Sequence, residues 1–131
     1  MKLTLYVEPT PKARPRIGTS RKTGKKYTYT PKPTVHAENL IRDRVMETDQ
    51  SFEAGTPIKL VATFFRVKPK STPKRVLLPV TKPDWDNMGK LLGDALEHFV
   101  YYSDSQITTA LIKKRFGSPP RIELEMSVDV P

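Results

Sequence analysis

Two aspartates and a lysine in the middle of the chain have the types and spacing that suit metal-dependent phosphate chemistry. Asp84 and Asp86 flank a single residue, and Lys90 follows Asp86 by four positions. Carboxylate oxygens are the ligands that Mg²⁺ and Mn²⁺ prefer, and a lysine beside them can stabilise charge on a phosphate. The chain contains no cysteine, so disulfides and thiolate metal sites are excluded.

A helix is expected to begin at these acids. Pro83 disfavours helical backbone in the residue before it. Apolar residues then recur at spacings of three and four, at Trp85, Met88, Leu92, Ala95 and Phe99. The pattern predicts a helix over about residues 86–98, with a solvent-exposed polar stripe at Asp94, Glu97 and His98.

Helical geometry decides whether the two acids can share an ion. Helical residues at i and i+2 point about 200° apart, so Asp84 and Asp86 converge only if Asp84 precedes the helix in extended conformation. Lys90 lies about 40° around the helix from Asp86 and would border the same site. The alternative is that Asp84 and Asp86 only stabilise the start of the helix, because an N-cap Asp contributes about 0.5–2 kcal/mol to helix stability.

Basic residues are concentrated in two segments that precede the acids. The chain carries 23 basic and 14 acidic side chains, a formal charge of +9. Residues 12–32 hold eight bases and no acid, residues 54–83 hold seven bases and no acid, and residues 84–104 hold five acids and one base. A polyanion is therefore the expected partner, and acids facing its phosphates indicate a divalent cation between them. The expected phosphate contacts are Lys12, Arg14, Arg16, Lys22, Lys25, Lys26, Lys68, Lys70, Lys74 and Arg75.

The remaining patterns predict a single α+β domain over residues 1–131, a mixed sheet of about five strands with two helices packed on it. Strands are expected at about 2–7, 26–30, 57–67, 107–116 and 121–128. The strand after Pro57 is apolar on both faces, so a central position covered on both sides is expected. A first helix is expected from Thr34 as its cap to about Glu47, with its inward face at Val35, Leu40, Ile41 and Val45.

The chain shows no sign of a membrane segment or a secretion signal. It has no apolar run near 18 residues, and its first residues alternate like a strand and lack the apolar block of a signal peptide. A cytoplasmic protein is expected.

Two tyrosines in the segment 26–30 allow two interpretations. Tyr27 and Tyr29 alternate with threonines, so both rings point the same way from a strand. They could stack on nucleic-acid bases beside the basic residues, or they could cover the core. Both interpretations stay open on the sequence.

Several motifs taken together resemble the RusA family of Holliday-junction resolvases. They are Asp-x-Asp-Asn-x-x-Lys at residues 84–90, Leu-Gly-Asp-Ala-Leu at 92–96, Tyr-Ser-Asp-Ser-Gln-Ile at 102–107 and Lys-Lys-Arg-Phe at 113–116. The segment Pro-Lys-Ala-Arg-Pro-Arg at 11–16 is similar to the family's basic opening. The likeness extends from about residue 9 to residue 116, and only the combination of motifs is specific.

The resemblance implies a homodimeric, Mg²⁺-dependent endonuclease, with Mn²⁺ as a substitute, that cuts four-way DNA junctions by paired nicks. Asp84, Asp86 and Asp104 match the positions of the family's metal-binding acids, and Lys90 matches its functional lysine. One departure is that Ser103 precedes Asp104, where many relatives have two acids.

Two other functions fit the same residues. One is a non-catalytic basic module that binds nucleic acid, in which Asp84 and Asp86 serve as helix-capping residues. The other is a nuclease for flaps or other branched DNA. A binding module gives no reason for Asp104 or for Lys90 beside Asp86.

Overall fold

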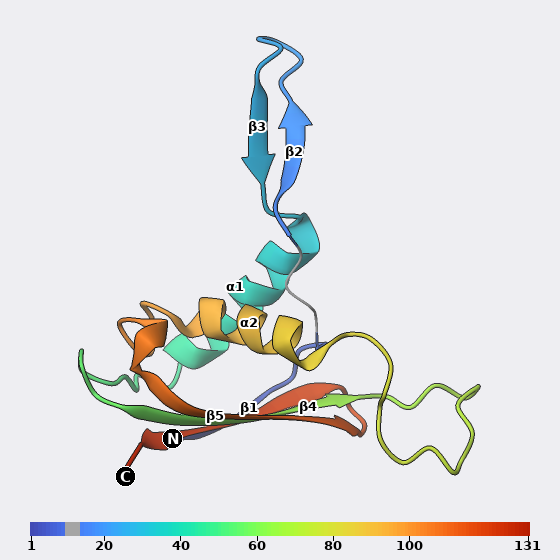
Figure 1. Ribbon diagram of the computed structural model, residues 1–131, viewed down its shortest axis with the longest axis vertical. Helices are drawn as coiled ribbons and strands as arrows, with labels where there is room; N and C mark the ends of the chain where they lie inside the picture. Colours follow the sequence, from blue (N-terminus) through green and yellow to red (C-terminus); the bar gives the residue numbers. More distant parts are fainter. Residues whose placement is uncertain (10–13) are drawn as a thin grey trace.

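A four-stranded sheet carries both helices on one face, and a two-stranded hairpin stands away from this body (Figure 1). A computed structural model describes residues 1–9 and 14–131. The strands are β1 (Lys2–Leu5), β2 (Arg16–Thr19), β3 (Lys26–Tyr29), β4 (Ile58–Arg66), β5 (Ile107–Phe116) and β6 (Arg121–Val128). The helices are α1 (Lys32–Met46) and α2 (Trp85–Leu96), with a 3₁₀ turn at Asp104–Gln106. The predicted α+β class is confirmed.

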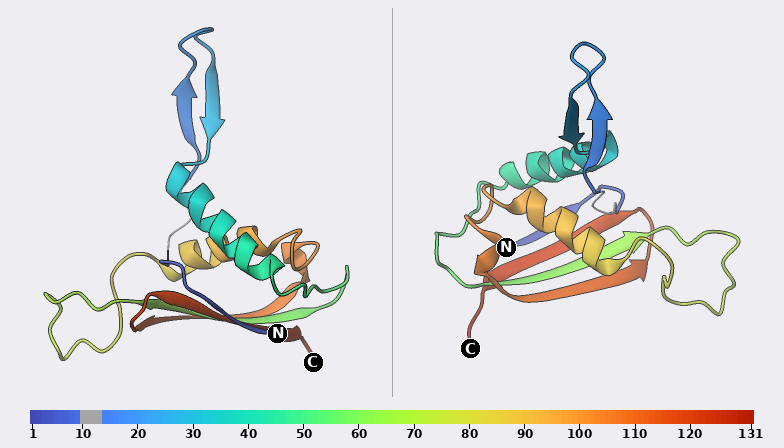
Figure 2. Two further views of the ribbon diagram at one scale, coloured as in Figure 1. Left: turned by 180° about the vertical axis from the view of Figure 1, so that it is seen from behind. Right: turned by 45° about the horizontal axis from the view of Figure 1, so that its top comes forward.

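The sheet has the order β1-β6-β4-β5. β4 pairs antiparallel with β6 and parallel with β5, and β1 pairs antiparallel with β6. Parallel neighbours need a crossover connection, and here the long loop at 67–84 and α2 provide it. The crossover places α2 over the sheet, running antiparallel to β5 (Figure 2). The two ends of α2 therefore lie above opposite ends of β5.

The core lies between the helices and one face of the sheet. From β4 it receives the alternating residues Ile58, Leu60, Ala62 and Phe64. The prediction that β4 is central is confirmed, but its other face is covered by neither helix. Val61, Thr63 and Phe65 on that face are only half-buried, because both helices pack on the same side (Figure 2).

The helices bury somewhat different residues from those predicted. In α2, Met88, Leu92 and Ala95 are buried as expected, but Trp85 at the first turn is 63% exposed and Phe99 lies beyond the helix end. α1 begins at Lys32 after Pro31, so Thr34 is a buried first-turn residue and not the cap. The buried stripe consists of Thr34, Ala37, Glu38, Ile41 and Val45, whereas Val35 and Leu40, which were predicted to face inward, are exposed.

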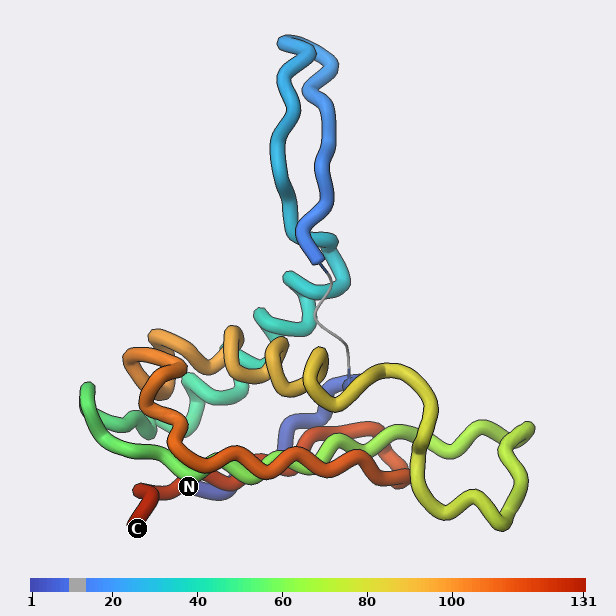
Figure 3. The backbone as a smooth tube through the Cα atoms, in the orientation of Figure 1, coloured from blue at the N-terminus to red at the C-terminus, as the bar shows by residue number. Residues whose placement is uncertain are grey.

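Two segments extend from the body, the hairpin β2–β3 and the loop at 67–84 (Figure 3). The sequence predicted β3 but treated residues 16–19 as loop, because β2 lacks an apolar alternation. No helix in the described part of the chain combines the length and hydropathy needed to cross a bilayer.

Candidate metal and phosphate site

Asp84 stands at the N-cap of α2 and does not act as a capping side chain. Its backbone is extended, with φ −72° and ψ 148°, and its side chain makes no cap hydrogen bond. The helix starts instead from its carbonyl oxygen, which accepts from the Met88 N–H at 3.2 Å. The extended conformation is the one required for Asp84 and Asp86 to converge, and it leaves the Asp84 carboxylate available to a ligand.

Asp86 and Lys90 follow on successive turns of α2. Asp86 is the acid of the first turn, and both side chains are exposed. Residues at i and i+4 lie on one side of a helix. In the described part of the chain, the carboxylates of Asp84 and Asp86 have no hydrogen-bond or ion-pair partner. The helix N-terminus therefore presents two unpaired carboxylates with a lysine beside them.

Two basic side chains from the ends of β4 and β5 hold the segment that leads into Asp84. Arg66 donates from Nη1 to the Lys82 carbonyl at 2.6 Å and to the Thr81 hydroxyl at 3.3 Å. Lys114 donates from Nζ to the Thr81 carbonyl at 2.8 Å. These charge-assisted bonds fix the position of the chain just before the acids. Neither residue was among the predicted site residues: Arg66 was counted only in the basic segment 54–83, and Lys114 only in the Lys-Lys-Arg-Phe motif.

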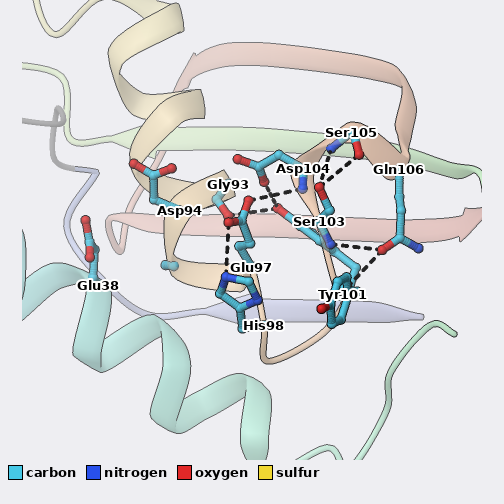
Figure 4. A network of polar contacts seen from close by, with 12 residues as sticks. Glu38, Gly93, Asp94, Glu97, His98, Tyr101, Ser103, Asp104, Ser105 and Gln106 are labelled. Carbon is cyan, nitrogen blue, oxygen red and sulfur yellow. Dashed lines mark hydrogen bonds and ion pairs between the residues drawn. The ribbon is translucent and has the colours of Figure 1, made fainter. Parts of the chain in front are cut away.

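Asp104 lies at the opposite end of α2, in a network of polar contacts (Figure 4). Its carboxylate is 2.8 Å from the Tyr101 hydroxyl and within 3.6 Å of the position that a Cβ on Gly93 would occupy. Its backbone N–H donates to Glu97 at 3.1 Å. Glu97, predicted as part of a solvated face, is instead half-buried at the end of α2 and pairs with His98 at 3.2 Å.

The Tyr101 hydroxyl lies 2.8 Å from two acceptors, Asp104 Oδ1 and the Gly93 carbonyl. A phenol has one proton, so both bonds form together only when Asp104 itself carries a proton. Partial burial, followed by the neighbouring Glu97 carboxylate, raises the pKa of Asp104 above its ordinary value, although the Tyr101 hydrogen bond acts in the opposite direction. Burial and the adjacent Asp104 also raise the pKa of Tyr101.

The turn that carries Asp104 is built by its neighbours. Ser103 caps it, accepting from the Ser105 N–H, and the buried Gln106 accepts from the N–H groups of Tyr102 and Ser103. The Gln106 amide donates to the Glu53 and Thr56 carbonyls at 2.9 and 3.1 Å. Gln106, two residues after Asp104, therefore has a structural role, because its hydrogen bonds hold the 3₁₀ turn against the loop before β4.

The three predicted acids do not gather at one point. Asp86 and Gly93 are seven residues apart, which is about 10 Å along a helix, and Asp104 lies beside Gly93. Among residues 1–9 and 14–131, no three His, Cys, Asp or Glu side chains are placed to hold one metal ion. The start of α2 thus carries Asp84, Asp86 and Lys90, whereas Asp104 lies separately in contact with Glu97 and Tyr101.

The predicted phosphate contacts fall on the two segments that extend from the body. Arg14, Arg16, Lys22, Lys25 and Lys26 are exposed on or beside the hairpin β2–β3. Lys70, Lys74 and Arg75 are exposed in the loop at 67–84, whereas Lys68 is half-buried, donates to the Lys74 carbonyl and lies 5.6 Å from the Phe116 ring centre. Lys12 lies outside the described residues.

Comparison with known proteins gives two relatives and one family. The model of the family described as endodeoxyribonuclease RusA matches residues 7–127. The uncharacterized protein YqaN of Bacillus subtilis (strain 168) is 29% identical over 95% of this chain and 93% of its own length. The crossover junction endodeoxyribonuclease rusA of Lactococcus phage r1t is 38% identical over 60% of each chain. Since the family model spans nearly the whole domain, the chain belongs to the RusA endodeoxyribonuclease family.

Proposed function

We propose that this protein is a Mg²⁺-dependent endonuclease that resolves four-way DNA junctions by paired nicks as a homodimer. The observation that carries the proposal is the start of α2, where Asp84 stands in extended conformation and does not cap the helix. Ordinary capping, the competing explanation of Asp-x-Asp, needs that missing hydrogen bond. Family membership supports the substrate and the chemistry.

The donor set at the start of α2 fits Mg²⁺. This ion is commonly held by one or two carboxylates together with waters and substrate phosphate, and Asp84 and Asp86 supply two exposed carboxylates. When bound, the ion supplies Lewis-acid polarisation of the phosphodiester and lowers the pKa of a water. Mn²⁺ has the same ligand preference and is the expected substitute.

The other residues of the site bind and orient the DNA. Lys90 provides a positive charge one turn from Asp86, where it would hold a phosphate oxygen against the site. Asp104 lies apart from Asp84 and Asp86 in this chain, and its proposed role in nicking rests on its place in the family motif. Hydrolysis by an attacking water would leave 5′-phosphate and 3′-hydroxyl ends, and a two-fold dimer would direct two sites to symmetry-related strands.

The test compares a four-way junction, a flap and a linear duplex of the same sequence, each with Mg²⁺ and with EDTA. The proposal predicts paired nicks in the junction that require Mg²⁺. Equal cutting of flap and junction would replace the resolvase with a more general branched-DNA nuclease. Tight junction binding with no cutting in Mg²⁺ or Mn²⁺ would favour the non-catalytic binding module, which the separate position of Asp104 supports.

Alanine at Lys114 should slow nicking without weakening DNA binding. Its bond to the Thr81 carbonyl holds the segment before Asp84. An exposed bond of this kind contributes about 1 kcal/mol, so we expect about a fivefold lower rate and a higher Mg²⁺ concentration at half-maximal activity. The matched control is Lys113→Ala, because alternation along β5 places Lys113 on the opposite face of the sheet. Equal losses in the two variants would show a general charge effect and no positioning by Lys114.

Glutamine at Lys70 should reduce the dependence of junction binding on salt. A lysine that touches a phosphate releases a counterion on binding, so its loss lowers the slope of log K against log salt by about 0.9. Lys70 is exposed in the loop at 67–84 that connects β4 to α2. Lys2→Gln, on the edge strand β1, is the control. An unchanged slope in the Lys70 variant would leave Lys70 as a residue that only aids solubility.

A further inference from the structure

The hairpin β2–β3 extends far from the rest of the molecule, as both views in Figure 2 show. Within the described residues its two strands pack on each other, and no other strand or helix packs on them to a comparable extent. A single two-stranded hairpin is at best marginally stable in water. It adds nothing to the core, since all but one of the residues of β2 and β3 are exposed. The hairpin therefore needs a role outside the fold.

One face of the hairpin carries an aromatic surface. Antiparallel pairing sets Arg16 opposite Tyr29 and Gly18 opposite Tyr27, and directly paired residues share a face. The rings of Tyr27 and Tyr29 are 5.9 Å apart between centroids, tilted by 44°. They are 52% and 42% exposed, so the interpretation that they cover the core is wrong.

Gly18 gives Tyr27 its position. A Cβ added to Gly18 would meet the Tyr27 ring at 2.6 Å, so the ring lies directly on the backbone of β2. Covering a strand glycine with a cross-strand aromatic ring is a known means of stabilising a sheet. The ring keeps its outer side open, which forms a flat aromatic platform on an exposed strand.

The charge around this platform selects its partner. Residues 14–32 contain seven basic side chains and no acid. Proteins that bind single-stranded nucleic acid combine aromatic rings, on which the bases stack, with positive charges that contact the phosphate backbone. A second copy of the same hairpin would bring like charges together, which is unfavourable. The charge thus favours a polyanion with exposed aromatic faces over another protein arm.

We propose that the face formed by Tyr27, Tyr29 and Arg16 is a stacking site for unpaired bases at the branch point of the DNA. The branched substrate rests on the proposed function, but the stacking itself requires no cleavage. Duplex arms keep their bases stacked, so only the branch point or a single strand offers a free base face. The hairpin would therefore favour branched over linear DNA, while its lysines and arginines contact phosphates in either.

The proposal is tested by fluorescence of junctions that carry 2-aminopurine either at the branch point or inside a duplex arm, in EDTA so that nothing is cut. Binding should change the fluorescence of the branch-point label and not of the arm label. The variant Tyr27→Leu/Tyr29→Leu should lose that change and bind oligothymidylate about fivefold to tenfold more weakly. Its salt dependence should stay as in the wild type, since no positive charge is removed.

Two controls separate stacking from a folding defect. Tyr27→Phe/Tyr29→Phe keeps both rings and should retain the wild-type response. Thr28→Ala, on the other face of β3, should also retain it. A leucine variant that bound oligothymidylate as tightly as the wild type, or equal fluorescence changes at branch and arm, would overturn the proposal. Stacking without Mg²⁺-dependent nicking would overturn the nuclease assignment and leave the stacking site intact.

Discussion

Asparagine at Asp84 should lower Mg²⁺-dependent nicking of a four-way junction at least about 100-fold, while junction binding stays the same or tightens. Loss of a residue that only supports a metal ligand typically reduces affinity or activity 10- to 100-fold, and loss of the ligand itself should cost no less. Binding should be retained because the change removes a negative charge that faces phosphates. The measurement is a nicking time course across Mg²⁺ concentrations, together with a binding titration in EDTA.

The same loss is expected for Asp86→Asn, since the two carboxylates would hold one ion. Asp43→Asn, an exposed change on α1, is the control and should leave nicking unchanged. Helix stability offers a second check. Because the Asp84 side chain makes no cap hydrogen bond, Asp84→Ala, which removes any capping oxygen, should leave the thermal midpoint nearly unchanged. Wild-type nicking by Asp84→Asn would remove Asp84 from the site, and a large fall in the midpoint of Asp84→Ala would show that Asp84 caps the helix after all.

Asparagine at Asp104 should stabilise the protein at neutral pH and lower nicking at least tenfold. The folded state raises the pKa of Asp104, so folding favours its protonated form. Its stabilising contribution is complete below the unfolded pKa, near 3.8, and is lost as the pH rises through the folded pKa. An asparagine stays neutral, and its amide N–H can donate to the Tyr101 oxygen as the protonated acid does, so the phenol proton remains with the Gly93 carbonyl.

The expected result is a thermal midpoint that is higher than that of the wild type at pH 7 and close to it at pH 3. Tyr101→Phe is the comparison variant, because it removes the hydroxyl and leaves the Gly93 carbonyl without this donor. That change should destabilise the protein by about 1–3 kcal/mol. A midpoint for Asp104→Asn that falls at pH 7 would contradict the raised pKa. Nicking at the wild-type rate by Asp104→Asn would show that Asp104 only stabilises the turn and has no role in cleavage.

The two variants at opposite ends of α2 also address whether one chain contains the whole site. Asp104 lies beside Gly93, about two and a half helical turns from Asp84, and no group of three ligands is assembled in the described part of the chain. If both changes abolish nicking but only Asp84→Asn shifts the Mg²⁺ requirement, Asp104 acts on the DNA or through the partner subunit. Equal shifts would place both acids on the same ion.

Local features of this protein follow from its sequence alone. The position of Lys90 one turn beyond Asp86, on the same side of the helix, depends only on helical geometry, and Pro83 with the apolar stripe sets where the helix begins. The strands β4, β5 and β6 follow from their alternation. The charge segregation and the family motifs are properties of the sequence itself, and they indicate a polyanionic partner and an endonuclease family without knowledge of the fold.

Three other features depended on the tertiary structure. The parallel pairing of β4 with β5 requires a crossover, and that crossover sets the start of β5 under the far end of α2. A short connection from α2 to β5 therefore carries Asp104 away from Asp84, which no local pattern encodes. The exposure of Tyr27 and Tyr29 was likewise undecided, because alternation gives the side on which two rings lie but not what covers that side. The capping question also needed the folded chain: Asp-x-Asp at a helix start is most often a cap, and only the structure shows that the Asp84 side chain makes no cap hydrogen bond, which leaves its ligand role as a proposal.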